Sequence, residues 1–361
     1  MGRIYNFAAG PSTLPLPTLE EASKKLVDFE GKGMSLIEMS HRGKIFDALH
    51  NETITLMKEI YQIPENFHVL FLQGGATLQF GMVPMAFLKQ GDTADFINTG
   101  AWAKKAISDA KIVGKINTIW DGKDNNYTRI PAQNELKFTP GAVYAHLCSN
   151  ETIGGIQWNY FPETGGIPLV ADMSSDVLSR PIPWDKFGLV FAGTQKNLAP
   201  SGLALVVMRK DFAEKARQDL PAYLRYDQHI SENSLYNTPP TFVIWMMNLT
   251  LKWIKSIGGL SAIEKLRDQK SNMLYDAIDK SGGYYTNPVD KGSRSKMNIV
   301  WRMKSEEMEA KFISEATKQG LDGLKGHRSV GGMRASVYNA MPVEGIKALV
   351  DFMKHFMEKN G

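Results

Sequence analysis

The sequence has few of the features that mark disulfide-rich, metal-binding or membrane proteins. Its 361 residues include one cysteine, Cys148, so an internal disulfide and a cysteine-rich zinc site are excluded. The seven histidines show no H-E-x-x-H or similar ligand spacing. No apolar run is long enough to span a bilayer, and the first residues lack the apolar core of a signal peptide. These absences predict a cytoplasmic protein without a metal and without membrane contact.

Strong charge of one sign is absent as well. The 42 Lys and Arg residues nearly balance the 38 Asp and Glu residues, which leaves a net charge of +4. No dense Lys/Arg block interleaves with aromatic residues, so nucleic acid is not a predicted partner. At this length, a hydrophobic content of 43% suffices for a large core and favours two domains.

Short apolar runs dominate the middle of the chain, separated by helical or loop stretches. Most of these runs are apolar throughout rather than alternating, as expected for strands that are covered on both faces. The pattern predicts an α/β fold in which helices flank a mostly parallel seven-stranded sheet. The predicted strands are Val69–Leu72, Ala94–Asn98, Ile116–Trp120, Ala142–Leu147, Pro168–Ala171, Leu189–Ala192 and Leu203–Met208.

A change of pattern after this region predicts a domain boundary. A long apolar helix over Phe242–Ile257 ends at Gly258, and the capping-box pattern Ser261–Glu264 predicts the start of the next helix. Helices then alternate with two predicted strands, Asn298–Met303 and Met333–Asn339, which indicates a smaller α+β domain. The predicted division is a large domain over residues 16–258 and a small domain formed by residues 1–15 and 259–361.

Lys196 lies in the segment V-F-A-G-T-Q-K-N-L-A-P-S-G, between the last two predicted strands of the sheet. A lysine with apolar chain on both sides is poorly solvated, and desolvation lowers its pKa by disfavouring the ammonium form. A neutral amine can attack an aldehyde and form a Schiff base, as lysines do with pyridoxal 5'-phosphate (PLP). The alternative is an ordinary exposed lysine, which is the default for any one lysine in this chain.

Other candidate residues follow strands at their carboxyl ends, where open α/β sheets bind ligands. Asp172 can pair with the pyridine nitrogen of PLP or only cap a helix. Trp102 can stack on the cofactor ring, although core packing explains a single tryptophan better. Thr152 can reach the ring's phenolic oxygen. The glycines of Q-G-G-A-T-L-Q-F (73–80) open a helix whose N–H groups can hold a phosphate, but the segment lacks nucleotide-binding spacing.

Two His-Arg pairs adjoin glycines. His41-Arg42 precedes one glycine, His327-Arg328 follows another, and Arg334 comes shortly after the second pair. Arginine binds carboxylates and phosphates through paired hydrogen bonds. Each pair alone is typical of a solvated loop. Together, beside a PLP pocket, they favour an acidic substrate with more than one anionic group.

These motifs resemble those of the phosphoserine aminotransferases, a family of fold-type I PLP enzymes. The resemblance covers nearly the whole chain, and the motifs occur in the family's order. They are F-A-A-G-P-S-T-L-P, S-H-R-G-K, L-F-L-Q-G-G-A, C-S-N-E-T-I-G-G-I, A-D-M-S-S-D, G-T-Q-K-N-L-A-P-S-G, Y-N-T-P-P-T and G-H-R-S-V-G-G-M-R-A-S-V-Y-N-A-M.

The resemblance implies roles for individual residues. Lys196 forms a Schiff base with PLP, Asp172 contacts the pyridine nitrogen and Trp102 stacks on the ring, so these three are the implied catalytic residues. The implied cofactor-binding residues are Ala76, Thr77, Trp102, Thr152, Asp172, Gln195 and Lys196, joined by Asn237 and Thr238 from the partner subunit of a homodimer. The implied substrate-binding residues are Arg334 for the α-carboxylate and His41, Arg42, His327 and Arg328 for the distal anion, some of them across the interface. Some members carry an arginine in place of Thr77, which leaves more of the phosphate binding here to Arg42, His327 and Arg328.

The implied reaction is a ping-pong transamination in L-serine biosynthesis. L-Glutamate leaves as 2-oxoglutarate, and a phosphorylated 2-keto acid, 3-phosphonooxypyruvate, becomes O-phospho-L-serine. Whether the enzyme also serves the 4-phosphonooxy-threonine step of pyridoxine biosynthesis stays open. The alternatives are another small-acid PLP aminotransferase, a cysteine desulfurase, or a binding protein of the same fold without PLP. The apolar run before Cys148 argues against a desulfurase, which needs an exposed, mobile thiol.

Overall fold

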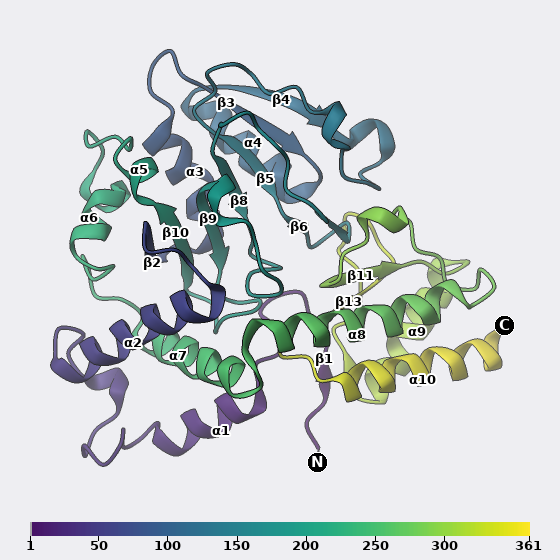
Figure 1. Cartoon of the computed structure of the whole chain (residues 1–361). Helices are drawn as coiled ribbons and strands as arrows, with labels where there is room; N and C mark the ends of the chain where they lie inside the picture. The colour runs from purple at the N-terminus through teal and green to yellow at the C-terminus, as the bar shows by residue number, and fades with distance from the viewer. Residues whose placement is uncertain (1) are drawn as a thin grey trace.

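The computed structural model describes residues 2–361, and its centre is a seven-stranded sheet (Figure 1). Neighbouring strands are parallel from β9 through β8, β5 and β3 to β4, whereas β10 runs antiparallel to both β9 and β2. The predicted α/β fold with a mostly parallel sheet is therefore confirmed, with one reversed strand. In spatial order the strands are β2 (Phe67–Gln73), β10 (Leu203–Arg209), β9 (Phe187–Gly193), β8 (Leu169–Asp172), β5 (Ala145–Cys148), β3 (Thr93–Asn98) and β4 (Lys115–Asp121).

Each predicted strand coincides with one of these strands, with small displacements at the ends. The largest displacement is in β5, which begins at Ala145 rather than at Ala142. Apolar runs continue past the hydrogen-bonded ladder because the flanking chain is also buried. The apolar pattern located the strands but carried no information on their direction, so the reversal of β10 was not predicted.

Helices cover the sheet on both faces, which explains why most of its strands are apolar throughout. Successive strand residues point to opposite faces. Accordingly, Val190 and Ala192 pack in one buried cluster, and Leu189 and Phe191 pack in another. The first cluster includes residues of α1 (Leu16–Lys25), α2 (Lys44–Tyr61) and α7 (Thr241–Ser256). The second includes residues of α3 (Gly75–Phe87), α4 (Ala101–Val113), α5 (Lys210–Ala213) and α6 (Tyr226–Ser231).

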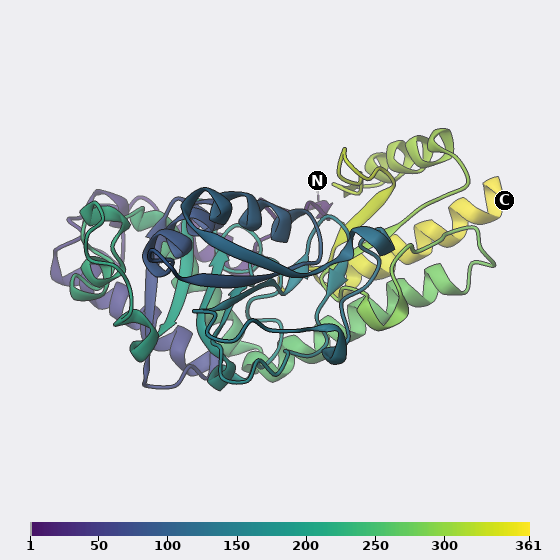
Figure 2. The same ribbon diagram turned by 90° about the horizontal axis from the view of Figure 1, so that it is seen from above.

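The C-terminal part of the chain has its own core and lies beside the sheet rather than over it (Figure 2). Its two longer strands, β11 and β13, form an antiparallel pair, and the N-terminal β1 pairs with β12 in parallel. The first residues of the chain therefore join this part, as the predicted small domain requires. Its elements are β1 (Tyr5–Asn6), α8 (Gly259–Asp279), β11 (Asn298–Trp301), α9 (Glu306–Lys318), β12 (Leu321–Asp322), β13 (Met333–Ser336) and α10 (Val343–Asn360).

The predicted start of the first helix after Gly258 needs one correction. Helix α8 begins at Gly259 with Gly258 as its cap, so the predicted capping box at Ser261–Glu264 lies inside the helix. Gly258 and Gly259 have φ values of 106° and 71°, a left-handed backbone that turns the chain before α8. The division of the chain into two domains at this point stays a prediction.

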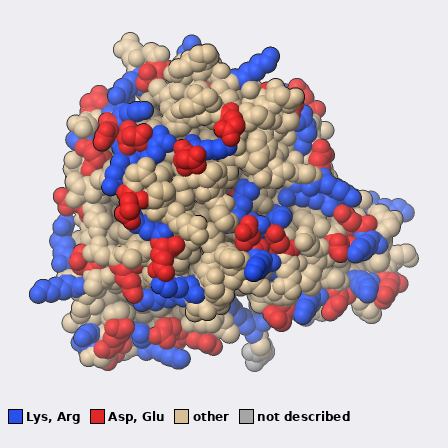
Figure 3. Space-filling model, viewed as in Figure 1, with Lys and Arg blue, Asp and Glu red and all other residues tan. Residues whose placement is uncertain are grey.

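The charged surface agrees with the modest net charge. On the face in Figure 3, basic and acidic side chains are interspersed rather than gathered into a field of one sign. Among the helices of residues 2–361, none combines the length and hydrophobicity that crossing a membrane would need.

Candidate active site

A cavity of about 760 Å³ opens where the carboxyl ends of several sheet strands face the small C-terminal part. Strand β8 ends at Asp172, and β2 leads through two glycines into α3. The small part contributes β13 and the loop before it. The cavity thus gathers residues that are far apart in the sequence. The predicted site residues that line it are Ala76, Thr77, Trp102, Thr152, Asp172, Gln195, Lys196, His327 and Arg334.

Lys196 projects into this cavity from the turn after β9. Its side chain is buried, and its Nζ donates a hydrogen bond of 2.7 Å to Thr152 Oγ1. The same nitrogen lies 5.3 Å from the centre of the Trp102 ring. Burial lowers the pKa of Lys196, and the nearby charge of Asp172 opposes that shift in part. The turn therefore presents a poorly solvated amine with few partners.

Asp172 ends β8 on the floor of the cavity, with 4% of its surface exposed. Its Oδ1 accepts hydrogen bonds from the backbone N–H (2.9 Å) and the hydroxyl (2.6 Å) of Ser174. Within residues 2–361 no hydrogen bond reaches Oδ2. Burial raises the pKa of Asp172, while Lys196 and the Ser174 hydrogen bonds favour the carboxylate. A cationic ring nitrogen is the kind of group that this free oxygen can hold.

Trp102 is fixed by a residue that sequence reasoning missed. Glu151, 1% exposed, accepts hydrogen bonds from the backbone N–H groups of Trp102 (3.0 Å) and Ala103 (2.9 Å) at the start of α4. Gly100 makes room for it, because a Cβ there would lie 2.7 Å from Glu151 Cδ. Burial raises the pKa of Glu151 to about 7. The sequence signal was only the position of Glu151 beside Thr152, since its partners are 48 and 49 residues away.

The start of α3 has the features of a phosphate cradle. Gly74 and Gly75 have φ values of 85° and 61°, and no side chain caps the helix. A Cβ at Gly74 would lie 2.7 Å from Leu78, so the tight turn requires a glycine. The first N–H groups of a helix have no intrahelical partner and carry positive potential. Ala76 and Thr77 line the cavity at this helix start, so their N–H groups can hold an anion there.

The small part supplies a cation to the cavity. Arg334 lies on β13, and its Nη1 donates to the backbone oxygen of Thr152 at 3.3 Å. Its Nε is buried without a partner among residues 2–361, so a hydrogen-bonding capacity stays unused. His327 also lines the cavity, and its Nδ1 lies 2.7 Å from Ser329 Oγ. Its neighbour Arg328 is exposed and lies outside the lining.

Besides Arg328, four more predicted site residues do not line the cavity of this single chain. His41 and Arg42 precede α2, where Arg42 Nη2 donates to the backbone oxygen of Leu235 at 3.5 Å. Asn237 and Thr238 follow Leu235 closely in the sequence, and the Thr238 backbone oxygen accepts from Gln73 Nε2 at 3.1 Å. The resemblance assigns these residues wholly or partly to a partner subunit, so their roles stay predictions.

The donor set fits PLP. The cavity offers a desolvated amine for the aldehyde of PLP and a carboxylate with a free oxygen for its pyridine nitrogen. An aromatic face is available for the ring, and a helix N-terminus for the phosphate. Cys148 is buried, and burial raises the pKa of its thiol well above the usual value, which disagrees with a catalytic thiol. Among residues 2–361, no cluster of three or more His, Cys, Asp or Glu side chains could hold a metal.

Comparisons with known proteins agree with this chemistry. Residues 4–349 match the class-V aminotransferase family. The chain is 53% identical to a phosphoserine aminotransferase of Lysinibacillus sphaericus over 358 residues, which cover 99% of each chain. It superimposes on the phosphoserine aminotransferase of Bacillus circulans subsp. alkalophilus with a TM-score of 0.98, at 50% identity and 99% coverage of both. A PLP-bound phosphoserine aminotransferase from Trichomonas vaginalis gives a TM-score of 0.93 at 40% identity, covering 98% of this chain and 100% of that one. The chain therefore belongs to the class-V aminotransferases and, within them, to the phosphoserine aminotransferase family.

Proposed function

We propose that this PLP-dependent aminotransferase transfers the amino group of L-glutamate to 3-phosphonooxypyruvate. The products are 2-oxoglutarate and O-phospho-L-serine, in L-serine biosynthesis. The observation that carries the proposal is the single cavity that joins Lys196 and Asp172 on the large sheet with Arg334 on the small part. In a chain about half identical to phosphoserine aminotransferases, this arrangement supports the same substrates.

Lys196 is the proposed proton carrier. PLP, when bound, supplies an electron-withdrawing ring that eases removal of the substrate's Cα proton. Burial favours the neutral amine of Lys196, which can take this proton and return it at the cofactor's C4′ carbon. Thr152 Oγ1, 2.7 Å from Nζ, holds the amine on the side of the cavity where Trp102 lies.

The remaining cavity residues hold the cofactor in place. We assign Asp172 to the pyridine nitrogen and Trp102 to the face of the ring. Thr152 and Gln195 contact the ring's polar substituents. The N–H groups at Ala76 and Thr77 bind the phosphate, because a helix N-terminus favours an anion. Asn237 and Thr238 of a second subunit complete this phosphate site in the proposed homodimer.

The cations divide the substrate between them. Arg334 binds the α-carboxylate that both substrates share. His327 at the cavity wall, with Arg328 beside it, binds the distal anion together with His41 and Arg42. Because neither member of the His41-Arg42 pair lines the cavity of its own chain, the proposal needs a dimer in which that loop reaches a partner's cavity. We place this dimer in the cytoplasm.

The decisive assay mixes the purified protein with PLP, L-glutamate and 3-phosphonooxypyruvate and measures 2-oxoglutarate. Turnover should depend on the phosphate of the keto acid, so pyruvate and glyoxylate serve as matched acceptors without it. The Lys196→Ala variant is the blank. Efficient use of the unphosphorylated acids, with poor use of 3-phosphonooxypyruvate, would favour another small-acid aminotransferase of the same fold. The four-carbon phosphorylated keto acid tests the pyridoxine step in the same assay.

A further inference from the structure

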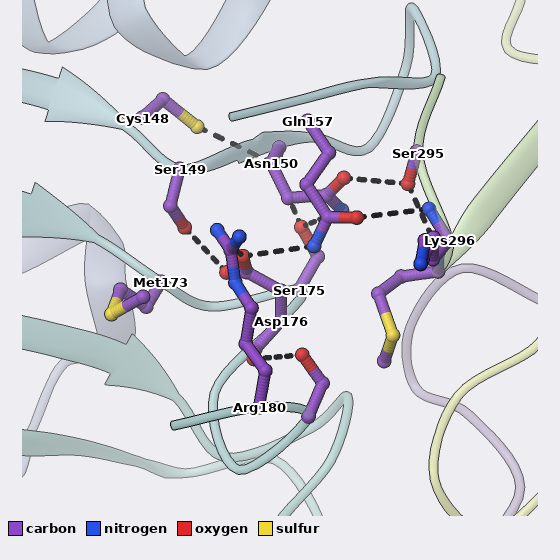
Figure 4. Close-up of polar contacts among 12 residues, drawn as sticks. Cys148, Ser149, Asn150, Gln157, Met173, Ser175, Asp176, Arg180, Ser295 and Lys296 are labelled. Carbon is purple, nitrogen blue, oxygen red and sulfur yellow. Dashed lines mark hydrogen bonds and ion pairs between the residues drawn. The ribbon is translucent and has the colours of Figure 1, made fainter. Parts of the chain in front are cut away.

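A chain of buried hydrogen bonds joins the large sheet to the strand that carries Arg334. Its central member is Asn150, on the short strand β6 (Asn150–Glu151), which pairs with β7 (Ile156–Gln157). Asn150 Nδ2 donates to Ser175 Oγ and to Asn298 Oδ1, both at 2.8 Å. Its Oδ1 accepts from Ser295 Oγ at 2.6 Å. Figure 4 shows Asn150 lying between Ser175 of the large part and Ser295 of the small part.

At one end, in the large part of the protein that contains the seven-stranded sheet, this series of hydrogen bonds is anchored next to the predicted cofactor site. Ser175 follows Asp172 by three residues and donates from its hydroxyl to the Asn150 backbone oxygen at 2.8 Å. The adjacent Asp176 is fully buried and accepts hydrogen bonds from Ser149 Oγ and from Gln157 Nε2 (Figure 4). Because these acceptors and donors are satisfied away from water, the anchor resists displacement.

At its other end, in the small C-terminal part, the series of hydrogen bonds leads to Arg334. Asn298, on β11, is fully buried, and its Nδ2 donates to Ser336 Oγ (3.0 Å) and Tyr338 Oη (3.1 Å). Ser336 lies on β13 two residues after Arg334, so the two side chains leave the strand on the same face. Arg334 in turn contacts the backbone oxygen of Thr152, two residues after Asn150. The contacts therefore form a closed ring of which the Arg334 guanidinium is one member.

We propose that the paired amides of Asn150 and Asn298 position Arg334 relative to Lys196. The inference rests on the proposed role of Arg334 as the α-carboxylate site. The substrate's carboxylate is then held by the small part, while its Cα proton is removed on the large part. A misplacement of about 1 Å between the two can cost about 100-fold in rate. Neither asparagine lines the cavity, so both are positioning residues.

The test is a double-mutant cycle between Asn150→Ala and Arg334→Ala. Asn150→Ala should raise KM for L-glutamate and for the keto acid about 10-fold, with kcat reduced less. In the Arg334→Ala background the same substitution should change kcat/KM little, because the group it acts through is gone. Binding of maleate, an unreactive dicarboxylate, gives a readout without turnover and should follow the same pattern. PLP affinity and the cofactor's absorbance should stay as in the unmodified protein.

Asn248→Ala is the matched control for loss of a buried asparagine. Asn248 lies on α7, 1% exposed, and donates to Glu52 Oε2 (3.0 Å) and Thr53 Oγ1 (3.2 Å), neither of which belongs to the ring that includes Arg334. It should lower the melting temperature without changing KM. If Asn150→Ala behaves only like Asn248→Ala, or if its effect persists in full in the Arg334→Ala background, the positioning role is wrong.

The same cycle separates this inference from the proposed function. If Arg334→Ala leaves maleate binding and both KM values intact, the proposed carboxylate site and the positioning role both fail. If Arg334→Ala impairs them but the cycle is additive, only the positioning role fails. Should Asn150→Ala not fold, Ser336→Ala takes its place in the cycle, since it deletes one hydrogen bond beside Arg334.

Discussion

Lys196 and Lys270 are both buried, in two regions that use the burial differently. Lys196 faces the cavity, with the Thr152 hydroxyl at 2.7 Å and the charge of Asp172 nearby. Lys270, on α8, is 1% exposed, and its Nζ donates to the backbone oxygens of Tyr338 (2.6 Å), Asn339 (3.5 Å) and Met341 (2.9 Å). Burial lowers the pKa of both lysines, that of Lys270 to about 7.

The comparison shows that desolvation alone does not make a lysine a catalyst. Lys270 Nζ lies within hydrogen-bond distance of three carbonyl oxygens of the 338–341 turn, so its N–H donors are used within the protein whether the amine is charged or neutral. Lys270 is not among the residues that line the cavity in front of Lys196. Lys196 has one hydroxyl partner and open space in front of it. Reactivity therefore requires a low pKa together with unused donors and room for a ligand.

The largest expected effect separates the two lysines by activity. Lys196→Ala should lower turnover by about 1,000-fold or more, because it removes both the covalent attachment and the proton carrier. Its PLP should still bind through the phosphate cradle but should no longer be fixed by borohydride, as mass spectrometry would show. Lys270→Met, the matched control, should keep borohydride fixation at Lys196. Full fixation of PLP in Lys196→Ala would refute the assignment.

A second test removes the carboxylate that only the Lys196 region has. Asp172→Ala should slow the chemical step by about 100- to 1,000-fold, the usual range for loss of one stabilising group. The effect should appear with both substrates, since both reactions use the same ring. Rapid-mixing measurements with L-glutamate deuterated at Cα would report it as a slower, isotope-sensitive step. A change confined to L-glutamate binding would mean that Asp172 has another role.

A third test extends the comparison to the arginines. A phosphate carries more charge and more acceptor oxygens than a carboxylate, so it should use more of the distal donors. Arg42→Ala and Arg328→Ala should therefore impair the phosphorylated substrate more than L-glutamate. Arg42 and Arg328 are exposed in the single chain, and where the proposed dimer buries such a charge-assisted contact, its loss costs about 2–5 kcal/mol. Arg334→Ala should hurt both substrates about equally. The measurement is kcat/KM for each half-reaction, and equal losses in all three variants would disprove the proposed distal site.

The strands and several cavity residues, Asp172 and Lys196 among them, could be predicted from local patterns, whereas Gln195 and the roles of Ala76 and Thr77 were implied only by the family resemblance. Val190 and Leu189 are apolar since each faces a helical layer, and Asp172 was found because it ends an apolar run. The reversal of β10 follows from the short connection between Gly193 and Leu203, which the apolar pattern does not register. The Glu151 cap on α4 depends on partners distant in the sequence, and no local pattern encodes it. The burial of Lys270 could not be predicted either, because the pattern of an amphipathic helix predicts that its lysines are exposed.

The last prediction uses pH to sharpen the comparison. The pKa of Lys270 is about 7 in the folded protein, against 10.5 for an ordinary lysine. Between these values the unfolded chain holds a proton on this lysine that the folded protein does not. The folded state therefore loses stability as the pH falls from 10.5 towards 7, and loses no more below that.

Lys270→Met lacks this dependence, so the free energy of unfolding of the wild type should rise relative to that of the variant between pH 7 and 9, with a slope that approaches about 1.4 kcal/mol per pH unit. Urea unfolding of both proteins at pH 7, 8 and 9, at one protein concentration, measures the difference. Contributions from Lys196 and the carboxylates are common to both proteins and cancel. Lys265→Met, on the exposed side of α8, controls for the loss of a lysine from this helix. A difference that does not change with pH would mean that the three carbonyl oxygens keep Lys270 charged despite its burial.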